Sequence, residues 1–233
     1  MEFLVLFFLQ LFLTLGASEN MDSAIQKMLK AYNKVLHPAT RDNQTVVVRH
    51  GLSLIRIVDL KDDVMTVDIW QDMEWSDPRL RWMPDVFDKI NIDIDLLWMP
   101  DIVLYNSGGV VSDLYPVVPR QALVSYDGTV FVVHILRLKV WCGDQSGCSN
   151  VDQDGTNTCK MKFGSWGYDG FRLDLQKRMD NMDLSSLSEH REWKVKNTTA
   201  VRNVVRYSCC VEPYPDITYT VQLAPKLDGG PSC

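Results

Sequence analysis

Long runs in which apolar and polar residues alternate are the feature of this sequence that most constrains its fold. In residues 64–75 the odd-numbered positions are the more apolar, and in residues 129–141 the even-numbered positions are. A period of two is typical of a β-strand that buries one face. The runs therefore predict an all-β domain, and their regularity favours a β-sandwich over alternating strands and helices.

Three large apolar residues fall on the outward faces of these predicted strands. Trp70 lies between Asp68 and Asp72 on the polar face of its run, and Phe131 and Val133 lie on the less apolar face of theirs. A lone outward tryptophan can be unremarkable, but tryptophan is enriched at interfaces. By pattern alone, Phe131 and Val133 are ordinary surface residues about as often as interface residues.

Two adjacent cysteines lie between two tyrosines in the stretch Tyr207-Ser208-Cys209-Cys210-Val211-Glu212-Pro213-Tyr214. Alternating runs at 201–207 and 217–223 flank it, which predicts a β-hairpin with the cysteines at its tip. Each cysteine could pair with a distant partner, or the two could pair with each other. A bridge between neighbours closes almost no chain, so it would stiffen and shape the tip rather than stabilise the fold.

A short helix is expected before the first strand. Asp22 or Ser23 can cap it, and Pro38 follows its expected end. The apolar residues at helical spacing are Ala24, Ile25, Met28, Leu29, Tyr32 and Val35.

The start of the chain predicts secretion. Residues 1–18 are mostly apolar and end in small residues, which is typical of a signal peptide, so residues 19–233 would form the mature domain. No later stretch reaches membrane-spanning length, and we expect a soluble, extracellular protein without membrane insertion. Sequons at Asn43 and Asn197 predict glycosylation.

Six cysteines in a secreted chain predict disulfides, although the spacing alone leaves the connectivity open. The spacing is not that of a zinc site and there are only four histidines, so no metal or other cofactor is expected. The formal net charge of -6 argues against a nucleic-acid partner and is compatible with a cationic ligand.

Several motifs resemble one known family. Tyr207-Ser208-Cys209-Cys210 with Tyr214 resembles the C-loop of nicotinic acetylcholine receptor ligand-binding domains of the α type, in the Cys-loop family. It is equally similar to the related soluble acetylcholine-binding proteins. Trp70-Gln71, with the stretch from Trp75 to Trp82, resembles the family's D-loop. Trp98-Met99-Pro100-Asp101 with Tyr105-Asn106 resembles its A-loop, and Gly164-Ser165-Trp166 resembles its B-loop. The resemblance extends over nearly all of residues 20–225.

The resemblance implies an immunoglobulin-like β-sandwich with a short N-terminal helix, assembled as a ring-shaped homopentamer with a ligand site between subunits. It also implies the disulfides Cys142–Cys159 and Cys209–Cys210. Apart from the resemblance, the pattern favours a core tryptophan at Trp98 and a turn at Pro100-Asp101, so we assign Trp98 and Asp101 to structure. The principal side of the site would consist of Tyr105, Trp166, Tyr207, Cys209, Cys210 and Tyr214. The complementary side would consist of Trp70, Leu123, Phe131 and Val133.

The loop between Cys142 and Cys159 departs from the receptor pattern. Receptors carry an aromatic-Pro-Phe-Asp motif there, facing the membrane domain, whereas residues 143–158 are polar and include an extra cysteine, Cys148. We expect Cys148 to pair with Cys233. The alternatives are a Cys148–Cys159 pair, and a Cys233 that is free or linked to another chain.

The function implied is recognition rather than catalysis. We expect a secreted, soluble binding protein for acetylcholine and for nicotine-like agonists and antagonists, with an aromatic cage that attracts the cation through the ring faces. The first alternative is the extracellular domain of a nicotinic-type channel subunit. The second, a secreted choline-ester hydrolase, is disfavoured because the sequence has no Gly-x-Ser-x-Gly elbow and no His-Glu-x-x-His motif.

Overall fold

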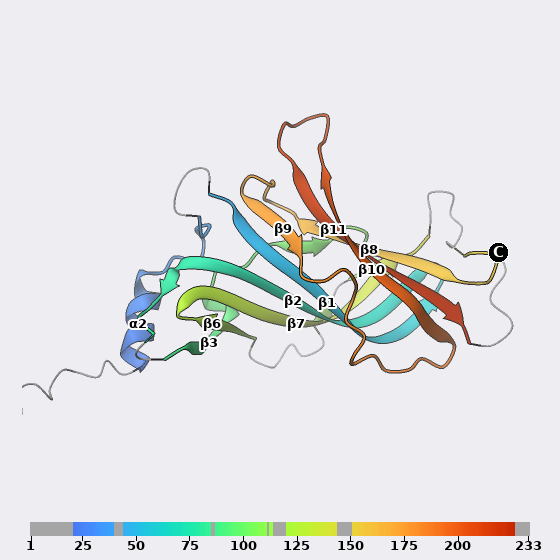
Figure 1. The fold of residues 1–233 in the computed structure, drawn as a ribbon, viewed down its shortest axis with the longest axis horizontal. Coiled ribbons are helices and arrows are strands. Elements are labelled where there is room, and N and C mark those ends of the chain that lie inside the picture. The colour runs from blue at the N-terminus through green and yellow to red at the C-terminus, as the bar shows by residue number, and fades with distance from the viewer. Residues whose placement is uncertain are drawn as a thin grey trace, which may run out of the picture.

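Two β-sheets packed face to face form the domain, with one helix at an end (Figure 1). The structure, a computed structural model, describes residues 21–39, 44–84, 87–110, 112–113, 120–143 and 151–226. It confirms the predicted β-sandwich with a short N-terminal helix. The predictions for the signal peptide (1–18), Asn43 and the Cys148–Cys233 bridge lie outside the described residues, whereas Asn197 is exposed on a strand.

Within the described residues, the larger sheet contains seven strands and the smaller sheet four. In spatial order the larger sheet contains β3 (Lys89–Asp93), β6 (Gln121–Ser125), β7 (Asp127–Trp141), β2 (Val64–Arg81), β1 (Val46–Lys61) and β9 (Leu173–Lys177), with β5 (Ser112–Asp113) beside β7. The smaller sheet contains β10 (Trp193–Val205), β11 (Tyr214–Pro225), β8 (Asn157–Ser165) and β4 (Ile102–Leu104). Only β1 and β9 pair in parallel among these neighbours. A short 3-10 helix covers Ile94–Leu96.

Alternation along the strands directs side chains as the sequence predicts. Every odd-numbered residue from Met65 to Trp75 is buried, and so are Val130, Val132, Leu138 and Val140 on β7. Asp68 is an exception, since it is buried on the outward face of β2 by ion pairs to Arg56 (2.6 Å) and Arg137 (2.7 Å). Burial raises the pKa of Asp68, but the hydrogen bonds from the two arginines outweigh it and leave that pKa below its ordinary value.

Helix α2 (Met21–Ala31) packs at the end of the sandwich where β3 and β6 lie (Figure 1). The capping prediction is wrong, because the helix includes Asp22 and Ser23 from its first turn. The predicted apolar stripe also extends too far: Tyr32 follows the helix, and Val35 is 79% exposed. A tertiary contact uses Tyr32 instead, since its hydroxyl donates to the buried carboxylate of Asp77 at 2.8 Å.

None of the helices in the described ranges has the length and apolarity needed to cross a membrane.

A buried polar network joins the two sheets at His50. The Tyr219 hydroxyl on β11 donates to the His50 carbonyl (3.0 Å) and lies 2.8 Å from Nδ1, while the Gln71 amide nitrogen lies 3.0 Å from Nε2. A neutral imidazole protonated on Nδ1 satisfies all three contacts. Burial lowers the pKa of His50 from 6.5 to about 3, because the charged form would lose its hydration.

We expect His50 to make the fold acid-sensitive. Because its pKa is depressed in the folded state, the unfolded state binds the proton first, and stability falls as pH drops from 6.5 toward 3. Between pH 7 and pH 5 this group should remove about 2 kcal/mol from the free energy of unfolding. Urea unfolding of wild type and His50→Gln at both pH values measures the difference. An equal pH dependence in the two proteins would contradict the buried, neutral assignment.

Candidate functional site

Four aromatic residues gather where strands of the smaller sheet end. Tyr105 follows β4 and Trp166 follows the neighbouring strand β8, and the centroids of the two rings lie 6.4 Å apart. Tyr207 and Tyr214 flank the turn between β10 and β11, with centroids 5.4 Å apart. Trp166 is 80% exposed and Tyr207 49% exposed, so two of these rings present large apolar surfaces to solvent.

The ring of Tyr105 is fixed against β8. Its hydroxyl donates to the Ser165 carbonyl at 2.6 Å, and Gly164 lies directly beneath, where any side chain would collide with that hydroxyl. Burial, together with the smaller effects of the nearby acidic groups of Tyr207, Asp216 and Asp101, raises the pKa of Tyr105 to about 12. Tyr105 is therefore a neutral hydrogen-bond donor that stays in place.

Asp101 positions the segment that carries Trp166. Its carboxylate accepts hydrogen bonds from the Ser165 hydroxyl (2.6 Å) and the Gly167 amide (2.5 Å), and its carbonyl accepts from the Trp166 amide (3.2 Å). Trp98 is 4% exposed and lies in the core. Both residues therefore have the structural role that the sequence predicted for them.

A charged pair lies next to the aromatic cluster. The Lys162 ammonium is 3.1 Å from the buried Asp216 carboxylate and 5.9 Å from the centre of the Tyr105 ring. Asn203 donates to the same carboxylate at 2.7 Å. Since Asp216 compensates Lys162, this cation adds little repulsion for a positively charged ligand.

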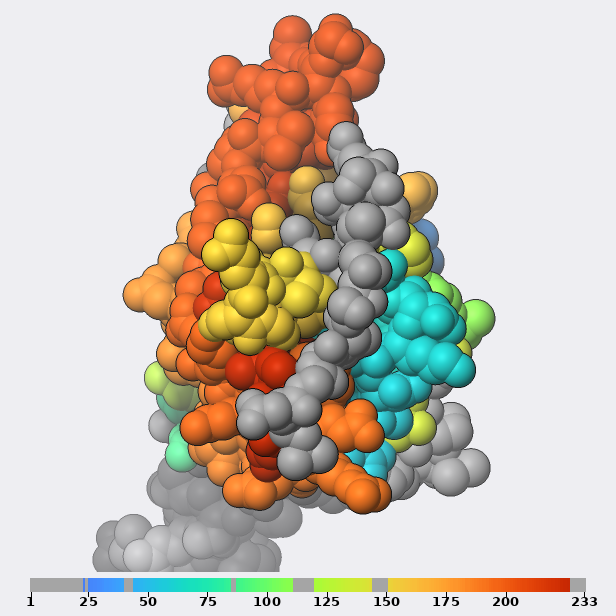
Figure 2. Space-filling view, turned by 90° about the vertical axis from the view of Figure 1, so that its right-hand side faces the viewer, coloured from blue at the N-terminus to red at the C-terminus, as the bar shows by residue number. Residues whose placement is uncertain are grey.

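The connection between β10 and β11 projects from the body of the domain in two perpendicular views (Figures 1 and 2). At its tip Cys209 and Cys210 are bonded to each other, and the Cys210 amide donates to the Tyr207 carbonyl at 3.2 Å. The tip therefore combines a local covalent constraint with few contacts to the core, which suits a lid over the aromatic cluster.

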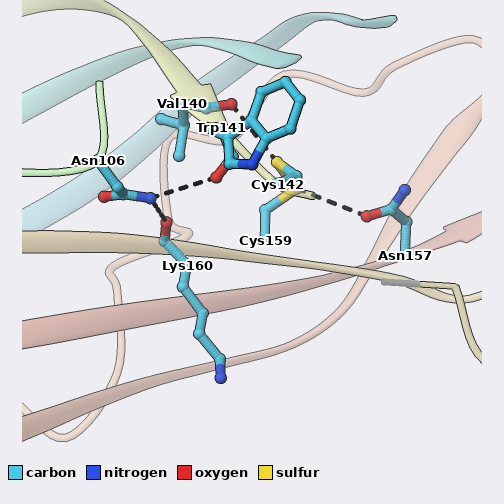
Figure 3. Close-up of a disulfide and its surroundings, with 7 residues drawn as sticks. All are labelled: Asn106, Val140, Trp141, Cys142, Asn157, Cys159 and Lys160. Atoms are coloured by element: carbon cyan, nitrogen blue, oxygen red, sulfur yellow. Dashed lines mark hydrogen bonds between the residues drawn. A yellow bond between two sulfur atoms is a disulfide. The ribbon is translucent and has the colours of Figure 1, made fainter. Parts of the chain in front are cut away.

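A second disulfide joins the two sheets. Cys142 follows β7 and Cys159 lies on β8, and the Asn106 side-chain amide bridges the same strands by donating to the carbonyls of Trp141 (3.2 Å) and Lys160 (2.6 Å), as Figure 3 shows. Because Asn106 follows Tyr105, this bridge also anchors the chain that carries the Tyr105 ring.

The predicted complementary residues form one patch on the outward face of the larger sheet. Leu123 pairs with Phe131 across β6 and β7, and Val133 pairs with Asp72, two residues after Trp70 on β2. Trp70 is 39% exposed and Val133 41% exposed, whereas Leu123 and Phe131 are half-buried. The patch and the four tyrosine and tryptophan rings belong to different sheets.

The ligand-binding domain of neurotransmitter-gated ion channels is the family whose model matches residues 21–226. The chain belongs to this family. It is 35% identical over 207 residues to the neuronal acetylcholine receptor subunit alpha-2 of Homo sapiens, which covers 87% of this chain and 38% of that relative. It is also 35% identical over 201 residues to subunit alpha-4 of Gallus gallus, covering 84% of this chain and 32% of the relative.

This ligand-binding domain thus spans less than two fifths of the length of these relatives. The similarity confirms a homologue of the nicotinic ligand-binding domain, in a family of receptor domains rather than enzymes. Within the described ranges, His, Cys, Asp and Glu form no group of three or more that could hold a metal ion.

Sequence reasoning missed several charged residues of the site. Lys162, Asp216 and Arg178 were not predicted, because isolated charges on strands and loops usually mark a solvated surface. Arg178 follows β9, and its guanidinium lies 5.1 Å from the centre of the Phe131 ring. Only the fold brings these two residues together.

Removing the Asp101 side chain should loosen the Trp166 segment while the fold persists. In Asp101→Ala, two charge-assisted hydrogen bonds are lost, each worth roughly 1.5–3 kcal/mol. We therefore expect amide exchange at Gly167 to accelerate by more than about tenfold. Hydrogen exchange of a peptide covering 163–170 tests this, with a peptide from the core strand β11 as the internal control. Unchanged exchange at Gly167 would show that Asp101 does not hold the segment.

Proposed function

We propose that this domain binds small cationic amines, acetylcholine among them, in an aromatic cage between two copies of the chain. The observation that carries the proposal is the convergence of Tyr105, Trp166, Tyr207 and Tyr214 at the end of one sheet, with large exposed ring surfaces. The relatives are acetylcholine receptor subunits, which supports the same ligand class.

Aromatic rings suit such a ligand for a physical reason. A quaternary ammonium spreads its charge over a weakly hydrated, apolar surface, and each ring face attracts it by roughly 0.5–2 kcal/mol once water is removed. A carboxylate would attract it too, but at a larger desolvation cost. The rings are rigid, so little side-chain entropy is lost on binding.

The position of the complementary patch supports an interface site. Trp70, Leu123, Phe131 and Val133 lie on the larger sheet, so one copy supplies the cage and its neighbour supplies this patch. Each chain carries both halves, and a closed ring of identical subunits completes every site. We therefore propose the homopentamer that the family resemblance implies.

Two settings are compatible with this site. The similarity to receptor subunits supports the extracellular domain of a channel subunit at least as well as a secreted binding protein. The polar stretch 143–158, in place of the receptors' aromatic motif, favours the secreted protein. Expression of the complete transcript in animal cells decides between them: recovery from the medium supports secretion, and recovery in washed membranes supports a channel subunit.

Cage residues should control affinity for the cation. Trp166→Ala and Tyr207→Ala should each weaken acetylcholine binding by more than about 1 kcal/mol, the scale of one desolvated cation–π contact. Tyr126→Ala is the matched control, because Tyr126 has a similar exposure of 42% in the turn before β7. Calorimetric titration measures the affinities and size-exclusion chromatography checks assembly. Wild-type affinity in both cage variants would rule out this cage.

Trp70 should act from the neighbouring subunit. Trp70→Ala should weaken binding while each subunit keeps its fold, because the side chain is exposed on an outward face. In oligomers that mix Trp70→Ala with Trp166→Ala, two kinds of site form between unlike chains. A site keeps both tryptophans when the Trp70→Ala chain supplies the principal side, and it lacks both when the Trp166→Ala chain does. A fraction of wild-type sites should therefore reappear on mixing. No recovery in verified mixed oligomers would contradict a shared site.

A further inference from the structure

One ring of the complementary patch already faces a cation of the same chain. The Arg178 guanidinium lies 5.1 Å from the centre of the Phe131 ring. The same group pairs with Asp72 at 3.1 Å and lies 3.8 Å from a Glu74 carboxylate oxygen. Both carboxylates come from β2, on the strand face that carries Trp70.

The backbone fixes this arrangement. Arg178 follows β9, and its amide donates to the His50 carbonyl on β1 at 3.0 Å. The next residue on β1 is Gly51, which pairs with Asp72 across the strands. A side chain at position 51 would begin 2.5 Å from Oδ1 of Asp72, so the glycine leaves the space in which this carboxylate lies. Arg178 can therefore reach across β1 to Asp72 and Phe131.

We propose that Arg178 makes the complementary side selective for monocationic ligands whose far end carries a hydrogen-bond acceptor or a carboxylate, against ligands with a second cationic group. This inference rests on the proposed function, because it concerns the part of the ligand that extends beyond the cage. The cage rings hold the ammonium, and the far end of the ligand meets Phe131 and Arg178.

Selectivity arises from local geometry rather than net charge. Arg178 and Arg49 lie beside Asp72 and Glu74, with Arg49 3.1 Å from Glu74, so two positive and two negative groups balance. The Phe131 ring, however, already contacts a guanidinium, so a second ammonium near that ring meets a like charge first. A carboxylate or ester oxygen there finds the planar donors of an arginine.

Three choline esters with the same head group test the proposal. They are acetylcholine, the half-ester of succinic acid with one choline, which ends in a carboxylate, and the diester of succinic acid with two cholines, which ends in a second ammonium. The measured quantity is the ratio of the Kd of the diester to the Kd of the half-ester. In Arg178→Gln this ratio should fall about tenfold, the size expected when unit charges interact through a largely aqueous surrounding.

Control variants separate charge from structure. Arg178→Lys keeps the charge and should retain most of the ratio. Arg202→Gln should leave the ratio unchanged, since Arg202 is ion-paired to Asp174 with 34% side-chain exposure, against 33% for Arg178, but belongs to β10 in the other sheet. In wild type, raising the salt concentration from about 50 mM to about 500 mM should lower the ratio of the diester Kd to the half-ester Kd, because salt screens exposed charges. This last test needs no variant.

The outcomes are distinct. A lower ratio in Arg178→Gln, with an unchanged ratio in Arg202→Gln, supports the inference. An unchanged ratio in that variant, or a wild-type ratio that does not respond to salt, overturns it while the proposed function stands. If wild type binds none of the three esters, the proposed function itself is overturned.

Discussion

The backbone pairing of the smaller sheet is the constraint on which the candidate site depends. β4, β8 and β11 are hydrogen-bonded neighbours, and each leads into or out of an aromatic residue where the ladder ends. A shift of one residue in the β4–β8 register would turn Tyr105 away from Gly164 and break its bond to the Ser165 carbonyl. Asn106 and the Cys142–Cys159 bridge then fix this sheet to the larger one. The aromatic cluster is therefore a consequence of strand register rather than of flexible loops finding one another.

Hydrogen-bonded polar groups give the site its precision. Asp101 and Asp216 each accept hydrogen bonds from more than one donor, and both act on segments that carry the rings. Partly satisfied carboxylates would be costly in such places, whereas fully bonded ones hold a single geometry. His50 performs a comparable task deeper in the core, where a neutral imidazole links β1 and β2 to β11. The strand that begins at Tyr214 is thus tied to the sheet that carries Trp70.

The two faces of the domain differ in what they leave exposed. The aromatic cluster presents ring surfaces at one sheet's end, and the other sheet presents Trp70 and Val133 on its outward face. Exposed aromatic surface of this kind is typical of positions that acquire a partner or ligand. The charge on the outward face of the larger sheet is uneven, because the Arg178 guanidinium lies over the Phe131 ring. In the proposed site between two copies, a ligand would meet the aromatic rings of one copy at one end and the planar cation of the neighbouring copy at the other.

The sequence by itself determined the strands, their buried faces and most of the aromatic residues. Period-two patterns predicted the core side of β2 and β7 correctly, because a strand with one buried face records its orientation in every second residue. Motif resemblance brought Tyr105, Trp166, Tyr207 and Tyr214 into one hypothesis, and in the fold Tyr105 lies beside Trp166 and Tyr207 beside Tyr214. The helix limits were predicted wrongly, since Tyr32 continues the helical spacing of apolar residues but follows the end of the helix, where its hydroxyl donates to Asp77. Only the tertiary structure decided the partners of the charged residues. Asp68 is buried by two arginines, and Arg178 reaches Phe131 across Gly51, because ion pairs and ring contacts depend on strand order, which no local pattern contains.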